Sequence, residues 1–406
     1  MGGSPNTRRK YVLIASGAVL LSCHGEYVPF SEACSNGDLE VGEICDDQNE
    51  VDGDGCNNDC TLSGTEQWTS CIESFADPAV RAAGVAFDWQ GNPILVATIV
   101  SEEGGPAKIW TRGFNPEGEV RWTSVCCDEP DTDFVAVDAA KSILTADKTI
   151  VIGGRINGGA HSDASLVLVL DGNGDRLWQA TATDMEPVLA VTAGSVDRVY
   201  AAVERDGKPV LLGLGSESWN RTIETASDGQ FTARALDGFS SLYAAGVIEG
   251  GAAKQCGWLG RYDSGQFLWQ SEDGNGRYLD LAVNYAGGDV YALAMTPCSG
   301  SAQTTVHHYD SAGIRSSELE FPAPHMDATG LGLAIDNSQR LTILAEGAGG
   351  PTLTRIAADG SMLWTTAVPM LKAQTLAVAA ATGHVALGGV NQKGGKVDVC
   401  LRYHSP

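Results

Sequence analysis

Short apolar stretches separated by polar turns run through the chain from about residue 65 to its last residues. Residues 84–88, 94–100 and 108–114 are three consecutive stretches of strand length, and Gly, Asn, Asp or Pro residues separate them. No long segment has the 3.6-residue apolar period of an amphipathic helix. Glycine is frequent at 50 residues, while charged residues make up only 19%. The pattern therefore predicts an all-β fold with many turns.

Tryptophan marks a repeat within this region. Six of the nine tryptophans each begin a short segment that follows a turn: Trp68, Trp122, Trp178, Trp219, Trp269 and Trp364. Their spacings are 54, 56, 41, 50 and 95 residues, and Leu319 lies near the middle of the last, double interval. Hairpin turns such as 116–119 and 358–361 precede these segments. Four strands in about 50 residues is typical of a β-propeller blade.

The repeat predicts a seven-bladed β-propeller over residues 65–406, with six or eight blades as alternatives. Three strands are expected after Trp364, and residues 65–72 would supply the fourth strand of that last blade. The two ends of the repeat region would then complete one blade and close the ring; the alternative is an open array of six blades. The units resemble quinoprotein-like propeller repeats, whose blades also end in a D-x-G-x-x-x-W type hairpin.

The first 22 residues are typical of an export signal. Arg8, Arg9 and Lys10 precede an apolar run that is shorter than the roughly 20 residues of a membrane-spanning helix. Leu20-Leu21-Ser22-Cys23 resembles a lipobox, which implies acylation of Cys23 after cleavage, followed by a tether over 23–33. The basic pair also resembles a twin-arginine signal, so the export route stays open. We expect a monomer held by its lipid in the cell envelope, at the outer membrane.

Net charge then narrows the range of partners. Cleavage removes three basic residues and no acidic residue, so the formal charge moves from −25 to −28. So acidic a surface repels phosphate backbones, and we expect no nucleic-acid partner.

Residues 34–62 predict a small cysteine-rich module. The segment from Cys34 to Cys60 resembles a bacterial repeat of the form CxNG(x)4GExCDDxN(x)4DGCxxxC, although Ser35 and Gln48 stand where glycine is usual. The resemblance implies a disulfide-stapled module with no established activity, and Cys34, Cys45, Cys56 and Cys60 allow three pairings. The segment holds nine acidic residues and no Lys or Arg. Calcium could compensate this charge through oxygen ligands from Asp46, Asp47, Asn49, Asp52 and Asp54; the alternative is a solvated acidic surface with Asx-turns.

Ten cysteines remain after Cys23, an even number that indicates disulfides in an oxidising compartment. We expect a bond between Cys256 and Cys298 on adjacent blades, and one between Cys71 and Cys400 that locks the ring. Comparison with the Trp269 hairpin places Cys400 opposite Thr69, two residues from Cys71 on the same face. The competing pair is Cys71 with Cys126.

Candidate chemistry is sparse. Cys126 and Cys127 are adjacent on a long connection of the loop-rich face, and this arrangement resembles the vicinal disulfide of quinone-dependent dehydrogenases. Acidic residues follow them, which makes this face a candidate ligand surface: Asp128, Glu129, Asp131 and Asp133. No other hallmark of those enzymes is present, and no HExxH, GxSxG, Walker or GxGxxG motif occurs.

We therefore expect a non-catalytic scaffold that binds a protein or a glycan, with a role in envelope assembly as a related option. A quinone-type oxidoreductase or a propeller hydrolase is the alternative. Converging polar groups in the central channel would favour an enzyme, whereas small apolar groups would favour a scaffold.

Overall fold

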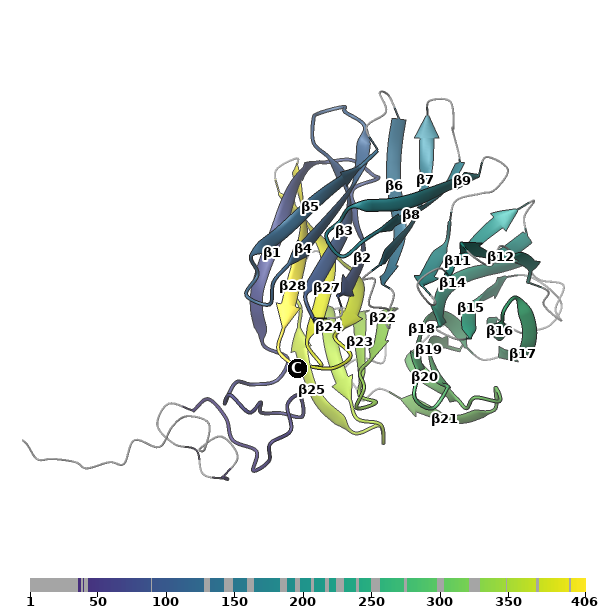
Figure 1. The fold of residues 1–406 in the computed structure, drawn as a ribbon. Helices are drawn as coiled ribbons and strands as arrows, with labels where there is room; N and C mark the ends of the chain where they lie inside the picture. Colours follow the sequence, from purple (N-terminus) through teal and green to yellow (C-terminus); the bar gives the residue numbers. More distant parts are fainter. Residues whose placement is uncertain are drawn as a thin grey trace, which may run out of the picture.

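The computed structural model describes residues 36–37, 39, 43–88, 90–127, 132–141, 149–158, 164–182, 188–193, 198–205, 208–215, 219–223, 230–238, 241–249, 256–273, 276–297, 303–320, 329–347, 349–369, 372–393 and 396–406. These residues form 28 strands in seven antiparallel sheets of four. The first strands of neighbouring sheets pack against one another around a ring (Figure 1). The fold is a seven-bladed β-propeller, as the repeat predicts.

The blades follow one another along the chain. Blade one contains β2 (Arg81–Phe87), β3 (Pro93–Val100), β4 (Ala107–Phe114) and β5 (Val120–Cys126). Blade two contains β6 (Thr132–Lys141), β7 (Ile150–Gly158), β8 (Ala164–Leu170) and β9 (Arg176–Ala182). Blade three contains β10 (Ala190–Ala193), β11 (Arg198–Arg205), β12 (Lys208–Gly215) and β13 (Trp219–Thr222).

The remaining blades repeat this order until the last. Blade four contains β14 (Gln230–Gly238), β15 (Leu242–Glu249), β16 (Gly257–Asp263) and β17 (Gln266–Asp273). Blade five contains β18 (Arg277–Asn284), β19 (Asp289–Thr296), β20 (Gln303–Tyr309) and β21 (Arg315–Glu320). Blade six contains β22 (Thr329–Ile335), β23 (Leu341–Gly347), β24 (Gly350–Ile356) and β25 (Met362–Ala367). Blade seven combines strands from the two ends of residues 65–406. Its first three strands are β26 (Lys372–Val378), β27 (Val385–Lys393) and β28 (Lys396–His404), and its fourth strand is β1 (Glu66–Phe75).

Ring closure rests on β1 and β28, which pair antiparallel over the length of both strands. A disulfide joins Cys71 to Cys400, with their Cα atoms 4.1 Å apart, so the pair expected from the sequence is present. The expected register is wrong, because Cys400 lies directly opposite Cys71 and Thr69 lies opposite Arg402.

A β-bulge explains part of this error. In each blade whose fourth-strand hairpin is described, the register shifts just before the Trp position, for example between Arg261 and Tyr262 in blade four. The bulge adds one residue, so Leu259 lies opposite Ser271 rather than Gln270. In blade seven two separate segments, β28 and β1, replace the hairpin, and their register differs from that of the blade-four hairpin by one further residue.

The Trp repeat connects neighbouring blades. Gly118, in the turn between β4 and β5, has a φ of +86°, and a Cβ there would lie 2.8 Å from Cδ2 of Trp68 in blade seven. Turn glycines of other blades approach the Trp of the preceding blade in the same way: Gly174 on Trp122, Gly265 on Trp219 and Gly313 on Trp269. In blade five Ser317 occupies the Trp register, and Gly360 approaches Leu319, two residues further along. These Trp side chains fill the space that a glycine of the next blade leaves free.

Apolar side chains of the inner strands fill the space between blades. Phe87, Leu95, Ile109 and Phe114 are almost fully buried, and such residues form a cluster at each junction of the ring. The outer strands alternate between half-buried and exposed positions, as β5 does. This pattern is the one expected for sheets that pack on both faces at the centre and meet solvent at the rim.

Candidate functional site

The described part of the cysteine-rich module comprises residues 36–37, 39 and 43–62, and it lies beside the C-terminal residues at one end of the ring (Figure 1). A disulfide joins Cys45 to Cys56, and Cys60 is also disulfide-bonded. Cys34 lies outside the described residues, as does the acylation candidate Cys23. Two of the three pairings left open by the sequence are therefore excluded, because each of them separates Cys45 from Cys56.

Two of the five predicted calcium ligands accept hydrogen bonds from the backbone of the module. Asp46 accepts hydrogen bonds from the backbone N–H groups of Gly37 and Gln48, and Asp52 accepts one from Asn58 N. These carboxylates hold turns of the module, as the Asx-turn alternative expects. Within the described residues, no three His, Cys, Asp or Glu side chains are arranged to hold a metal ion.

Two of the five do lie together. Burial raises the pKa of Asp54, and the neighbouring Asp47 carboxylate raises it further. Asp54 accepts a hydrogen bond from Asn49 Nδ2 at 3.2 Å, while Asp47 accepts one from Cys56 N at 3.0 Å. The Oδ1 atom of each carboxylate is buried and has no hydrogen-bond partner in the structure. Calcium binding stays a prediction, and Asp47 and Asp54 are the two carboxylates that would bind the ion together.

The predicted ligand surface near Cys126 is only partly described. Cys126 and Cys127 form a vicinal disulfide, so the competing Cys71–Cys126 bond is excluded. Asp133 accepts a hydrogen bond from Ala107 N at 2.8 Å and thereby joins blade two to blade one. The other three acidic candidates lie outside the described residues: Asp128, Glu129 and Asp131.

The second predicted interblade disulfide is also partly described. Cys256 is disulfide-bonded, whereas Cys298 lies outside the described residues. The pairing of these two cysteines stays a prediction.

The central channel has a volume of about 300 Å³, and the first strands of the blades line it. Apolar side chains from five blades contribute to its wall: Ala83, Val137, Leu189, Leu279 and Leu331. Its carboxylates bind backbone N–H groups of the next blade, since Asp138 accepts from Val191 N and Asp280 from Leu333 N. Burial raises the pKa of Asp280 to about 7, and Asp138 and Asp237 contribute in the same direction. Polar groups line the channel as well, among them Asp138, Asp280, Arg234 and Gln374. Such a convergence is the feature expected of an enzyme, whereas the use of the two carboxylates to connect blades is the feature expected of a scaffold, so the channel is compatible with both.

A larger cleft lies between the module and the ring. Backbone bonds fix this junction: Gly64 N donates to Pro406 O, and Ser405 N donates to Thr65 O. Arg340 in blade six donates to the carbonyl oxygen of Asp52. The module is therefore attached to blades six and seven at several points.

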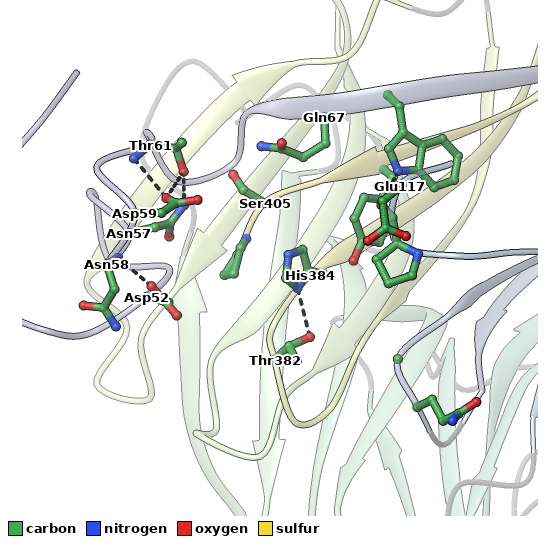
Figure 2. Close-up of a pocket in the computed structure, with 16 residues that line it drawn as sticks. Asp52, Asn57, Asn58, Asp59, Thr61, Gln67, Glu117, Thr382, His384 and Ser405 are labelled. Atoms are coloured by element: carbon green, nitrogen blue, oxygen red, sulfur yellow. Dashed lines mark hydrogen bonds between the residues drawn. The ribbon is translucent and has the colours of Figure 1, made fainter. Parts of the chain in front are cut away.

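The cleft has a volume of about 660 Å³, within the range of small-molecule sites. Figure 2 shows the module side chains Asn58 and Asp52 on one side, Glu117 on the other, and His384 between them. The ring contributes the hairpin β26–β27, the C-terminal residues, the start of β1 and two hairpins of blade one.

Three aromatic rings are stacked at the base of this cleft. Tyr403 lies between Trp68 and His384, with a centroid distance of 5.1 Å to each and interplanar angles of 15° and 9°. Trp68 Nε1 donates to Pro116 O at 2.7 Å, which orients the indole. Burial raises the pKa of Tyr403 to about 12, with a further contribution from Glu117.

The cleft carries negative charge. Its acidic side chains are Asp52, Asp59 and Glu117, and no Lys or Arg among the described residues lines it. Burial lowers the pKa of His384 and outweighs the opposite effect of Asp52 and Asp59, so this imidazole is neutral at pH 7. The cleft is therefore polar and anionic.

Sequence reasoning missed the cleft because its parts lie far apart in the chain. Its walls come from residues 52–61, 67–68, 90–91, 116–117, 382–384 and 403–406. The one available signal is the ring closure itself, which brings residue 65 next to the C-terminal residues.

Comparison with known proteins supports the fold and adds no family. No family model matches the chain, and no curated protein matches it. The solved structure described as "Crystal structure of RRP9 WD40 repeats" is similar with a TM-score of 0.55 and 10% identity, over 84% of this chain and 99% of that one. A protein of unknown function from Bacteroides caccae matches at a TM-score of 0.40 and 9% identity, over 61% and 84%. In the part of the chain that the structure describes, no helix is long and apolar enough to cross a membrane.

Proposed function

We propose that this chain is an exported, lipid-anchored binding protein of the cell envelope, in which the propeller is a non-catalytic scaffold. The observation that carries the proposal is the cleft between the module and the ring, which is fixed on both sides by hydrogen bonds and disulfides. Rigid scaffolds that present loops around a cleft are the usual setting of ligand sites. The channel carboxylates Asp138 and Asp280 connect neighbouring blades, which suits a scaffold.

Anchoring rests on Cys23 and the export signal before it. Replacement of Cys23 by alanine is expected to move the protein from the membrane fraction to the soluble fraction of cells. A Cys23→Ala chain that stays in the membrane fraction would refute the anchor.

Ligand binding in the cleft is testable in living cells. A photo-crosslinking amino acid at Gln67, which is exposed in the cleft, is expected to give discrete adducts. The same group at Val125, exposed on the outer strand of blade one, serves as control. Equal adducts at the two positions, or none at Gln67, would argue against a ligand cleft.

An oxidoreductase is the second candidate, because the vicinal disulfide Cys126–Cys127 is one element of quinone-dependent enzymes. Here the pair lies at the end of the outermost strand β5, whereas the channel is lined by first strands. Mass spectrometry of the native, folded protein would detect a bound quinone, and its presence would favour this second candidate.

A further inference from the structure

We infer that the cleft between the module and the ring binds a neutral saccharide. The inference rests on the proposed function, because it assigns a ligand class to the cleft described above. It follows from three properties of the walls: their hydrogen-bonding groups, their charge and their aromatic base.

The hydrogen-bonding groups suit a ligand rich in hydroxyls. Amide side chains project from both walls, with Asn58 on the module and Gln67 and Gln90 on the ring. An amide offers a carbonyl acceptor and two N–H donors, and a sugar hydroxyl can bond to either. The structure gives the side chain of Gln67 no hydrogen-bond partner, and this residue is exposed in the cleft (Figure 2). Gln67 therefore has its full bonding capacity available for a ligand.

Charge excludes anionic ligands. Three carboxylates and a neutral imidazole face the cleft without any Lys or Arg in its walls. A phosphate, a sulfate or a uronic acid would be repelled there, since like charges at close range are unfavourable. The ligand must be neutral or cationic.

The bonding of the carboxylates favours the neutral class over a cationic peptide. Asp52 accepts the backbone N–H of Asn58 at 2.7 Å, and Asp59 accepts both the backbone N–H and the hydroxyl of Thr61. These two groups already stabilise the module and are partly neutralised by its dipoles. Glu117 alone has no hydrogen-bond partner in the structure, and one exposed carboxylate is a weak basis for peptide recognition.

The aromatic base supplies an apolar surface of the size of a sugar ring. Tyr403 is only 3% exposed because the rings on its two sides cover it. Gly118 lies against the other face of Trp68, so the half-buried His384 at the end of the stack is the aromatic ring whose face a ligand would meet. The C–H face of a pyranose can lie against this ring while its hydroxyls reach the amides above.

Both walls are held in place before any ligand arrives. The Cys45–Cys56 disulfide fixes the module, and the buried Arg355 donates to Gly383 O, next to His384. Little conformational freedom would be lost on binding, which favours affinity. The volume of about 660 Å³ leaves room for a short oligosaccharide rather than a single sugar.

The test uses the full mature chain on a broad array of neutral glycans, followed by calorimetry with the oligosaccharide that binds best. Hexalysine and an oligogalacturonate serve as cationic and anionic probes. Gln67→Ala and Glu117→Ala are each expected to weaken saccharide binding about tenfold, as the loss of one hydrogen bond to a ligand predicts. Gln392→Ala is the matched control, because Gln392 is exposed at the other end of β27 from His384.

Each outcome decides the matter. Saturable binding of a neutral oligosaccharide that Gln67→Ala weakens and Gln392→Ala leaves unchanged supports the inference. Binding of hexalysine alone, or equal binding of the oligogalacturonate, overturns the saccharide class and leaves the ligand cleft standing. An empty array overturns it as well, and the crosslinking at Gln67 then decides separately whether the cleft binds anything. Saccharide binding that Gln67→Ala does not weaken places the site elsewhere.

Discussion

Replacing Gly118 by alanine tests how neighbouring blades are joined. The new Cβ would lie 2.8 Å from Cδ2 and 2.9 Å from Cγ of Trp68, closer than real Cβ atoms approach other heavy atoms. The indole cannot retreat easily, because Tyr403 is stacked on its other side and His384 lies beyond Tyr403. Either the hairpin β4–β5 or the whole aromatic stack must move.

The loss of unfolding free energy caused by Gly118→Ala has two parts, a backbone cost and a steric cost, and a matched control variant separates them. Gly118 has a φ of +86° and Gly91 a φ of +82°, and both backbone conformations cost an L-residue about 1–2 kcal/mol. A Cβ at Gly91 meets nothing within 4 Å. The difference between Gly118→Ala and Gly91→Ala therefore isolates the steric conflict, for which overpacking data suggest about 1–3 kcal/mol.

Denaturant unfolding of the two variants and the wild type provides the measurement. We expect the unfolding free energy of Gly118→Ala to be about 1–3 kcal/mol lower than that of Gly91→Ala. Gly118→Ala should also weaken ligand binding in the cleft, because it displaces the aromatic stack. Equal stabilities of the two variants would refute the reasoning, since the indole would then have room to move at no cost.

Three further predictions concern other parts of the molecule. Replacing Cys71 and Cys400 together by alanine opens a loop of 329 residues, and the unfolding free energy should fall by up to about 5–6 kcal/mol; a change below about 1 kcal/mol in denaturant unfolding would contradict this. Because the folded pKa of Asp280 is raised to about 7, its contribution to stability is present at pH 4 and lost as the pH rises towards 7. In urea unfolding, the wild type should therefore lose stability relative to Asp280→Asn as the pH rises from 4 to 7. A difference in unfolding free energy between the two proteins that does not change with pH would contradict this prediction. Millimolar calcium should raise the melting temperature of the full chain but not that of Asp47→Asn; no shift in the wild type would exclude the calcium site.

The sequence predicted those features that repeat along the chain. Six tryptophans at one position revealed the blades and, with Leu319, their number. The incomplete last unit revealed the closure by β1, and with it the pairing of Cys71 with Cys400. The register was wrong because a bulge changes the residue count of a hairpin without a distinctive residue at the bulged position, which is Arg121, Leu177 or Leu268 in different blades.

The candidate site could not be predicted from the sequence, because its residues are neighbours only in the folded chain. Acidic composition suggested Asp46 and Asp52 as metal ligands, but composition does not reveal the backbone N–H groups that each of them binds in the fold. The cleft depends on contacts between segments more than 300 residues apart, such as Thr65 N with Ser405 Oγ. Only a three-dimensional arrangement reveals such neighbours.

The pairing of β1 with β28 also sets an order for folding. Among the 28 described strands, β1 leaves the ribosome first, yet its only partner strand is the last to be synthesised. Until then β1 and β27 each present an unpaired edge, a condition that favours aggregation or capture by a chaperone. The cleft cannot form either, because β28 contributes Tyr403 to its base. Any ligand binding in the cleft would therefore require a closed ring, so an interrupted chain would lack the cleft as well as the stability of the closed fold.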